Sequence, residues 1–351
     1  MKLTIVIPCL NEVSTIEKAV KIASRAARQY LKKEFEIIVA DNGSTDGTLE
    51  KLAKFRSIKL IHVPIKGYGA ALHYGILSAK YPYVFFADAD LSYDFGELKK
   101  FLVYINKGYD LILGSRIRGK IEKGAMPFLN RYLGTPMLTT LNHLVYGIKA
   151  SDCNSGMRAI KTSFYRQLKM KNSGMEWASE LLIKTAINNG RYIELPINFY
   201  KDQRGKIPHL RRWEDGWRHL KVIILLKPAT LVIFALILLL IGLIFLPVSL
   251  FTTIAMTLFA EFWLLSYLLT KKLEEALSRE ANPISSWLDR IPLVFIAVIV
   301  TFLGFLQLFI ISDYHLFTKY ILFFQMILFD FWLFFIETIK THLIHPLPDK
   351  I

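Results

Sequence analysis

The sequence predicts an α/β head, with a mostly parallel sheet and helices on both faces, followed by an α-helical transmembrane domain of four spans. The first observation is an alternation of short apolar runs with amphipathic segments across residues 3–114. The second is a series of long apolar runs after Pro228, in a chain of 351 residues that is 53% hydrophobic. Alternating strand and helix patterns imply a parallel sheet covered on both faces. Apolar runs of about 20 residues can cross a bilayer.

The head is expected to begin with five strands and four helices. The apolar runs predict strands at Leu3–Pro8, Glu36–Asp41, Ile58–Val63, Tyr83–Asp88 and Asp110–Gly114. The segments between them predict helices at Ser14–Gln29, Asp46–Phe55, Tyr68–Ala79 and Asp94–Asn106. Farther along, residues 175–190 predict another helix and Tyr192–Tyr200 a late strand. Polar residues gather just after the strands, which is where open α/β sheets bind ligands.

Capping residues mark the starts of three of these helices. Ser14 and Asp46 are expected to be N-caps, because a short polar side chain there satisfies backbone N–H groups that the helix leaves free. Asp94, followed three residues later by Glu97, fits a capping box.

The transmembrane domain is expected to occupy residues 228–351. Its four spans are predicted at about 229–246, 248–269, 292–311 and 317–339. Four basic residues lie between the second and third spans, whereas the hairpin at Pro247 carries no charge. The positive-inside rule therefore places both termini and the head in the cytoplasm, in the plasma membrane if the cell is a prokaryote.

Charge is distributed unevenly between the two parts. Residues 1–227 hold 37 Lys and Arg against 20 Asp and Glu, whereas residues 228–351 hold 7 against 9. A basic head on an apolar tail suggests an anionic partner at the bilayer, and no nucleic acid partner is expected. Residues 206–227 predict an amphipathic helix in the headgroup layer, with a helix packed on the head as the alternative. Residues 126–146 predict a pair of membrane-surface helices.

Two carboxylates close the fourth predicted strand. Asp88 and Asp90 stand at positions i and i+2, where the apolar run ends and a loop begins, so both can reach one hard cation. Mg²⁺ or Mn²⁺ held by one or two carboxylates usually completes its coordination with substrate phosphates. A helix cap or a pair of surface carboxylates would give the same local pattern.

The order of several motifs supports a metal-binding role for these two carboxylates. Four segments stand out besides Asp88–Asp90, namely Ile5–Glu12 (IVIPCLNE), Asp41–Thr48 (DNGSTDGT), Gly67–Ala71 (GYGAA) and Asp152–Arg158 (DCNSGMR). In this order and spacing they resemble the family 2 glycosyltransferases with the GT-A fold, over residues 1–205. Within the family, the chain is similar to the dolichol-phosphate (polyprenol-phosphate) mannose synthases. That likeness comes from Ala87–Ser92 (ADADLS), Gly114–Arg116 (GSR) and Asn130–Arg131.

The resemblance implies a function and a set of site residues. The expected reaction moves one mannose from GDP-mannose to dolichyl or polyprenyl phosphate, with inversion at the sugar. UDP-glucose as the donor is the first alternative. The implied nucleotide-sugar-binding residues are Pro8, Asn11, Glu12, Asp41, Asp88, Ala89, Asp90 and Arg204, with Asp88 and Asp90 also holding the Mg²⁺ or Mn²⁺ cofactor.

The chemistry of a lipid phosphate agrees with such a reaction. A phosphate monoester is already anionic near neutral pH and needs no general base. It does need cations beside the sugar, and guanidinium groups suit phosphate oxygens. Arg116 and Arg131 are the candidates for binding the acceptor phosphate and are counted among the catalytic residues with Asp88 and Asp90. Arg204 is expected to help neutralise the leaving diphosphate.

Two other readings stay open. A processive polysaccharide synthase would share the head motifs, and residues 209–213 (HLRRW) approach the Q-x-x-R-W motif of those enzymes. Such an enzyme must deprotonate a sugar hydroxyl, for which Glu176 or Glu180 could serve. A degenerate head acting as a lipid-binding scaffold is the non-enzymatic alternative, although Asp41, Asp88, Asp90 and Arg158 are all present.

Overall fold

A seven-stranded mixed sheet forms the centre of the head in the computed structural model, which describes residues 2–205, 212–227 and 348. Its strands lie in the order β3-β2-β1-β4-β6-β5-β7. β6 pairs antiparallel with both β4 and β5, and the other pairs are parallel. The strands are β1 Leu3–Cys9, β2 Phe35–Asp41, β3 Lys59–His62, β4 Tyr83–Phe86, β5 Leu111–Ser115, β6 Arg158–Lys161 and β7 Tyr192–Pro196.

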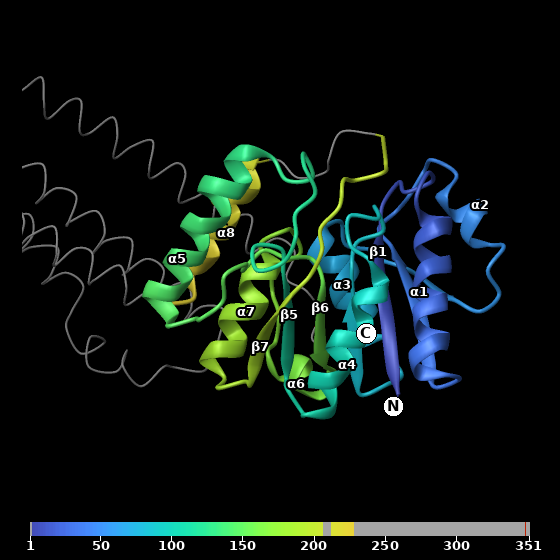
Figure 1. Cartoon of the computed structure of the whole chain (residues 1–351), viewed down its shortest axis with the longest axis horizontal. Helices are drawn as coiled ribbons and strands as arrows, with labels where there is room; N and C mark the ends of the chain where they lie inside the picture. The colour runs from blue at the N-terminus through green and yellow to red at the C-terminus, as the bar shows by residue number, and fades with distance from the viewer. Residues whose placement is uncertain (1, 206–211, 228–347, 349–351) are drawn as a thin grey trace, which may run out of the picture. The chain divides into compact units, whose positions relative to one another are not determined.

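Helices cover both faces of this sheet (Figure 1). The first group comprises α1 Ile16–Leu31, α2 Thr48–Leu52, α3 Tyr68–Leu77, the short 3-10 helix η1 Phe95–Glu97 and α4 Leu98–Asn106. The second group comprises the π-helical turn η2 Asn130–Gly134, α5 Thr135–Tyr146, α6 Thr162–Gln167, α7 Trp177–Ile187 and α8 Arg212–Leu225. In Figure 1, α1 and α2 lie at one end of the sheet, while α5 and α8 lie side by side at the other.

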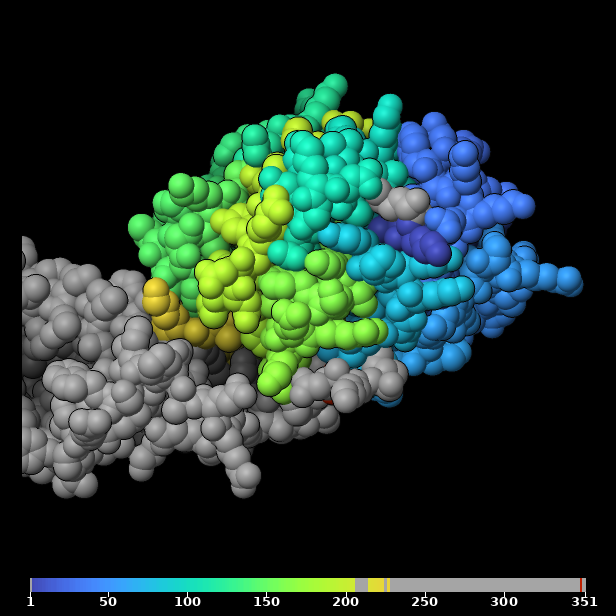
Figure 2. Space-filling view, turned by 90° about the horizontal axis from the view of Figure 1, so that it is seen from below, coloured from blue at the N-terminus to red at the C-terminus, as the bar shows by residue number. Residues whose placement is uncertain are grey.

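All side chains of strand β1 are buried, because helices pack against both faces of the sheet. Leu3, Ile5 and Ile7 join the core formed with α1 and α4. Val6 points to the other face and touches α3 at Gly75. A strand that is apolar on both sides is typical of a parallel sheet with two helical layers. Figure 2 views the edge where β1 begins, so the polar residues that follow β1, β2 and β4 lie at the opposite edge.

The predicted α/β architecture is confirmed, with differences in detail. The predicted strands agree with β1–β5 and β7 to within a few residues, and α1–α4, α7 and α8 lie within their predicted ranges or extend them slightly. The short strand β6 and the helix α6 were not predicted. The late strand ends at Pro196 instead of Tyr200, and residues 197–200 continue as a loop with isolated bridges at Phe199.

Two of the predicted helix caps are wrong. α1 begins at Ile16, and the Ser14 hydroxyl donates instead to the backbone oxygen of Arg204. Asp46 lies one residue before the N-cap of α2, although its carboxylate accepts from the backbone N–H of Thr48. Asp94 does cap η1, accepting from the backbone N–H of Gly96 at 2.8 Å.

In a capping box the second side chain, here Glu97, bonds back to the N-cap backbone N–H. Glu97 makes a long-range contact instead. The Glu97 carboxylate accepts from the amide Nδ2 of Asn198 at 3.2 Å and forms an ion pair with Lys100. Its role is therefore to attach the start of α4 to the segment that follows β7.

The predicted spans at 229–246, 248–269, 292–311 and 317–339 lie outside the described residues. Across residues 2–205 and 212–227, no helix is both long and apolar enough to cross a membrane. The predicted surface pair at 126–146 is a π-helical turn that runs directly into α5 at Thr135. α8 packs one face on the head, where Asp215, His219, Val222 and Ile223 are buried.

The contact between α3 and β1 gives a test of this packing. A methyl group added at Gly75 would lie 2.4 Å from Cγ1 of Val6. We expect Gly75→Ala to lower the free energy of unfolding by about 1–3 kcal/mol, because a filled core must shift to accept it. The matched control is Gly216→Ala in α8, where no atom lies within 4 Å of the added methyl. This control should be neutral or stabilising by up to about 1 kcal/mol, and equal melting temperatures for the two variants would contradict the packing.

Candidate active site

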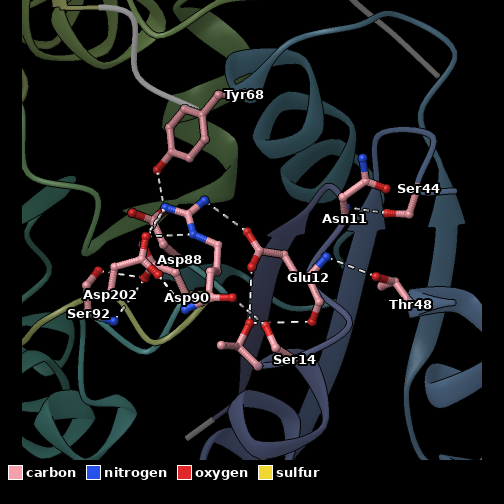
Figure 3. A network of polar contacts seen from close by, with 12 residues as sticks. Asn11, Glu12, Ser14, Ser44, Thr48, Tyr68, Asp88, Asp90, Ser92 and Asp202 are labelled. Atoms are coloured by element: carbon pink, nitrogen blue, oxygen red, sulfur yellow. Dashed lines mark hydrogen bonds and ion pairs between the residues drawn. The ribbon is translucent and has the colours of Figure 1, made fainter. Parts of the chain in front are cut away.

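The two aspartates after β4 lie at the carboxyl edge of the sheet. Ala87 and Ala89 are buried, and they fix the loop so that Asp88 and Asp90 face the same region. Oδ1 of Asp90 accepts from the backbone N–H and the hydroxyl of Ser92, at 2.9 and 2.6 Å. Oδ1 of Asp88 accepts a 2.8 Å hydrogen bond from the Tyr68 hydroxyl (Figure 3).

The loop before β6 closes the far side of Asp88. A Cβ atom added at Gly156 would lie 2.7 Å from Oδ2 of Asp88, so the backbone approaches the carboxylate closely here. The Gly156 N–H donates to the Tyr93 hydroxyl at 2.8 Å. The guanidinium of Arg158 holds the same loop by donating to the backbone oxygens of Cys153, Ser155 and Ala178, each at 2.8 Å.

Two carboxylates in this region have raised pKa values. Burial, followed by the charge of Asp90, raises the pKa of Asp88 to about 7. Burial also raises the pKa of Glu12 to about 7, against the opposing effect of the Arg204 guanidinium. Desolvation and neighbouring negative charge both disfavour the ionised form, so a cation bound beside these carboxylates would favour their ionisation and lower both pKa values.

The residues predicted to line the nucleotide pocket gather where β1 and β2 end. Asp41 accepts from the backbone N–H groups of Gly43 and Ser44, at 3.0 and 3.2 Å. Asn11, with a φ of 55°, joins the two loops by accepting from the Thr45 N–H at 2.8 Å. Pro8 is buried in β1 beside Ala40.

Glu12 and Arg204 connect this pocket to the aspartates. Oε1 of Glu12 lies 3.2 Å from Nη1 of Arg204, and Nη2 of the same guanidinium lies 3.2 Å from Oδ2 of Asp90. Glu12, Asp90 and Arg204 are therefore brought together, as Figure 3 shows for the two carboxylates.

The two predicted acceptor residues occupy different surroundings. Arg116 forms a two-pronged ion pair with the buried Asp152, with Nε–Oδ2 at 2.7 Å and Nη2–Oδ1 at 2.8 Å. Its positive charge partly opposes the rise in the pKa of Asp88. Arg131 lies on η2 with its guanidinium 5.4 Å from the Tyr132 ring centroid, and within the described residues it shares no hydrogen bond or ion pair with the aspartates.

Some site residues were not singled out from the sequence. Tyr68 and Asp202 contact the cluster directly, and Asn42 supports it by accepting from the Gly67 N–H at 2.7 Å. Gly67 has a φ of 134°, and a Cβ there would lie 2.2 Å from the Ser173 oxygen. Tyr68 and Asn42 belong to the two motifs that begin at Gly67 and Asp41, which is the signal that could have identified them.

Asp88 and Asp90 fit a divalent cation that is shared with a diphosphate. Within residues 2–205 and 212–227, no group of three or more acidic, His or Cys side chains is arranged to enclose an ion. Mg²⁺ typically binds one or two carboxylates and keeps positions for substrate phosphates. The two crowded carboxylates, with the raised pKa of Asp88, match that donor set.

Comparison with known proteins identifies the family. The profile of glycosyl transferase family 2 matches residues 4–169. The dolichyl-phosphate hexose transferase of Haloferax volcanii is 34% identical over 172 residues, which are 48% of this chain and 72% of that protein. The chain belongs to glycosyl transferase family 2.

Two further comparisons define how far the likeness extends. The low-salt glycan biosynthesis hexosyltransferase Agl6 of H. volcanii is 35% identical over 230 residues, 65% of this chain. The match spans about half of that relative, 54% of its length. A crystal structure of a mycobacterial protein shares the fold of 64% of this chain and 74% of its own, with a TM-score of 0.51 and 18% identity. The head of this family 2 chain is thus a GT-A-like α/β domain with a mixed sheet.

The hydrogen bond from Tyr68 to Asp88 predicts a pH dependence of metal binding. The pKa of Asp88 is raised to about 7, so Mn²⁺ should bind less tightly as the pH falls through 7 and protons compete for the carboxylate. Tyr68→Phe removes a hydrogen bond that lowers this pKa. We expect the midpoint to move upward by up to about one pH unit.

Mn²⁺ binding measured by electron paramagnetic resonance at several pH values would check this shift. Tyr83→Phe is the matched control, because its hydroxyl donates to the Tyr109 oxygen at the opposite edge of the sheet. A midpoint that moved downward in Tyr68→Phe, or moved equally in both variants, would contradict the assignment.

Proposed function

We propose that this chain transfers one hexose from a nucleotide sugar to the phosphate of a dolichyl or polyprenyl lipid, with inversion at the anomeric carbon. Mannose from GDP-mannose is the first candidate, and glucose from UDP-glucose is the second. The observation that carries the proposal is the meeting of Asp88 and Asp90 with the guanidinium groups of Arg204 and Arg116 at one sheet edge. The relative named as a dolichyl-phosphate hexose transferase supports the choice of acceptor.

The surroundings of one of the two candidate bases favour a phosphate acceptor over a sugar hydroxyl. A hydroxyl acceptor requires a general base, whereas a phosphate monoester is already an anion near pH 7. Glu180 is occupied structurally, accepting from the backbone N–H groups of Lys171 and Asn172 at 2.8 and 2.9 Å. Glu176 is buried at the start of α7, where burial raises its pKa and it accepts from the Gly174 N–H at 3.3 Å. Glu180 is thereby excluded as a general base, whereas Oε2 of Glu176 has no hydrogen-bond partner among the described residues and stays available to a processive synthase.

The chain's own residues divide the reaction between them. Asp41 and Asn11 order the loops that receive the nucleotide, and Arg204 stabilises the charge that develops on the departing diphosphate. Arg116, held rigid by Asp152, and Arg131 attract the acceptor phosphate toward the anomeric carbon. A bound Mg²⁺ or Mn²⁺ on Asp88 and Asp90 would supply further neutralisation of the diphosphate.

An exposed apolar surface supports placing the head at a bilayer. Six large apolar side chains of residues 128–144 are more than 45% exposed, which is unusual for a soluble surface. They are Phe128, Leu129, Tyr132, Leu133, Met137 and Leu144. Arg131 lies among them, where it could meet a lipid phosphate at the headgroup layer.

The proposed arrangement along the chain combines this surface with the long apolar runs after Pro228. Residues 1–205 form the catalytic head, 206–227 contain a helix at the interface, and 228–351 hold the four spans that anchor it. The Tyr146 hydroxyl donates to the backbone oxygen of Ile223, so α5 and α8 would rest on the same membrane surface. Both termini would be cytoplasmic, in the plasma membrane of a prokaryote.

Transfer of a radiolabelled sugar into an organic extract tests the proposal. Membranes containing the chain are incubated with labelled GDP-mannose or UDP-glucose and a polyprenyl phosphate. We expect one donor to label the lipid and Asp90→Asn to reduce the rate at least about 100-fold, because the variant loses a carboxylate that would hold the metal, and with the metal the neutralisation of the leaving group. Asp110→Asn, near Arg191 at the opposite edge, is the control. The proposal would be refuted if neither donor labelled the lipid, or if labelling continued in Asp90→Asn.

The acceptor role of Arg131 has its own test. We expect Arg131→Ala to raise the KM for lipid phosphate about tenfold or more, since one charge-assisted contact is worth about 1.5–3 kcal/mol. The affinity for the nucleotide sugar should not change. Arg166→Ala, an exposed arginine on α6, serves as the control. A loss of donor affinity with an unchanged acceptor KM would assign Arg131 to the donor instead.

A further inference from the structure

One guanidinium contacts carboxylates from three separate segments of the chain. Arg204 reaches Oε1 of Glu12 and Oδ2 of Asp90, each at 3.2 Å, and donates through Nε to Oδ2 of Asp202 at 2.7 Å. Its side chain is only 12% exposed. Glu12 and Asp90 are 78 residues apart in the chain, and Figure 3 shows how closely they converge with Asp88 and Asp202.

The loop that carries Arg204 is fixed to its surroundings by several hydrogen bonds. The Gln203 N–H donates to the backbone oxygen of Asp90 at 3.0 Å, and Lys18 donates to the Gln203 side chain at 3.0 Å. The Ser14 hydroxyl donates to the backbone oxygen of Arg204 at 3.2 Å. These contacts place the guanidinium between Glu12 and Asp90 through the backbone, independently of the ion pairs themselves.

Arg204 occupies the oxygen of Asp90 that a cation would need. Oδ1 of Asp90 accepts two hydrogen bonds from Ser92, and Oδ2 faces Nη2 of Arg204. A divalent ion close to Oδ2 would therefore be repelled by the guanidinium. Because two cations compete for one carboxylate, Arg204 must lose this contact for Asp90 to coordinate metal through that oxygen.

We propose that Arg204 is an exchangeable counter-ion, which leaves Glu12 and Asp90 for the diphosphate of the nucleotide when a divalent cation takes Asp90. This inference rests on the proposed function of the site. The bond between Asp202 and Arg204 lies within the same loop, so it can persist while the guanidinium turns toward phosphate oxygens. Glu12 then acts as a positioning residue that holds Arg204 before the donor arrives.

The exchange couples the binding of metal and nucleotide. Without a nucleotide, Arg204 opposes the metal by holding Asp90. With a nucleotide, the guanidinium and the metal bind the same diphosphate, so the metal and the nucleotide strengthen each other's binding. By thermodynamic linkage, each ligand must then raise the affinity of the other by the same factor.

Arg204→Gln in the full-length chain, purified in detergent, separates the two effects. Mn²⁺ affinity is measured without nucleotide by electron paramagnetic resonance, and GDP and UDP affinities are measured by calorimetry at saturating Mn²⁺. We expect Mn²⁺ alone to bind about tenfold more tightly, because a repelling charge close to the metal is gone. The nucleoside diphosphate should bind about tenfold more weakly, because it loses a charged partner. Arg191→Gln, over the Tyr109 ring at the opposite edge, should change neither.

The wild-type chain provides a second measurement that requires no variant. Trypsin can cut after Arg204 only when that side chain is free to enter the protease. Mn²⁺ alone should accelerate cleavage between Arg204 and Gly205, and Mn²⁺ with GDP or UDP should slow it again. Cleavage is quantified by mass spectrometry.

The outcomes distinguish this inference from the proposed function. Unchanged or weaker Mn²⁺ binding in Arg204→Gln, together with cleavage that ignores Mn²⁺, would overturn the exchange while leaving a working donor site. A wild-type chain that binds neither Mn²⁺ nor either nucleotide would overturn the proposed function as well.

Discussion

An excess of negative charge at the carboxyl edge of the sheet is the constraint on which the site depends. Glu12, Asp90 and Asp202 contact the single guanidinium of Arg204, and Asp88 lies close to Asp90. The raised pKa values of Glu12 and Asp88 express the cost of this crowding, since burial and like charges both oppose ionisation. Such an arrangement is poor for stability but well suited to receiving a cation and a diphosphate together. The helices and strands hold the four carboxylates in place despite their repulsion.

The second cluster of charges pairs each carboxylate with an arginine, Asp152 with Arg116 and Glu194 with Arg118. Glu194 of β7 accepts from the backbone N–H groups of Ser151 and Asp152, at 2.8 and 2.9 Å, which fixes the turn before β6. Asp152 in turn holds Arg116 at two nitrogens. Breaking a buried pair leaves an uncompensated charge, so this arginine is not free to move far. The site thus combines a fixed cation, Arg116, with Arg204, which in our proposal gives up its place at Asp90 to a metal ion.

The sequence predicted the parts of the structure that depend on residues close together in the chain. The apolar runs located β1–β5, and their ends located Asp41, Asp88 and Asp90, because parallel strands bring their carboxyl ends to one edge. β6 was not predicted because its four residues begin with a charged residue, Arg158. The fold alone supplies the three backbone oxygens that accept hydrogen bonds from this buried guanidinium. The contact between Glu12 and Arg204 joins residues 192 apart, which no spacing rule can predict. Ser14 failed as a cap for the same reason, since its partner lies 190 residues away.

The direction in which charge moves in the proposed reaction matches this division into a fixed and an exchangeable cation. When the acceptor oxygen attacks the anomeric carbon, a phosphate monoester becomes a diester and loses negative charge. The bond from that carbon to the diphosphate breaks, and the leaving group gains the same charge. In that reaction Arg116 would face the acceptor phosphate, whose charge falls, so a rigid position that releases product is sufficient. Arg204 would face the diphosphate, whose charge rises, and a guanidinium that has already left Asp90 for the diphosphate becomes more stabilising as the bond breaks.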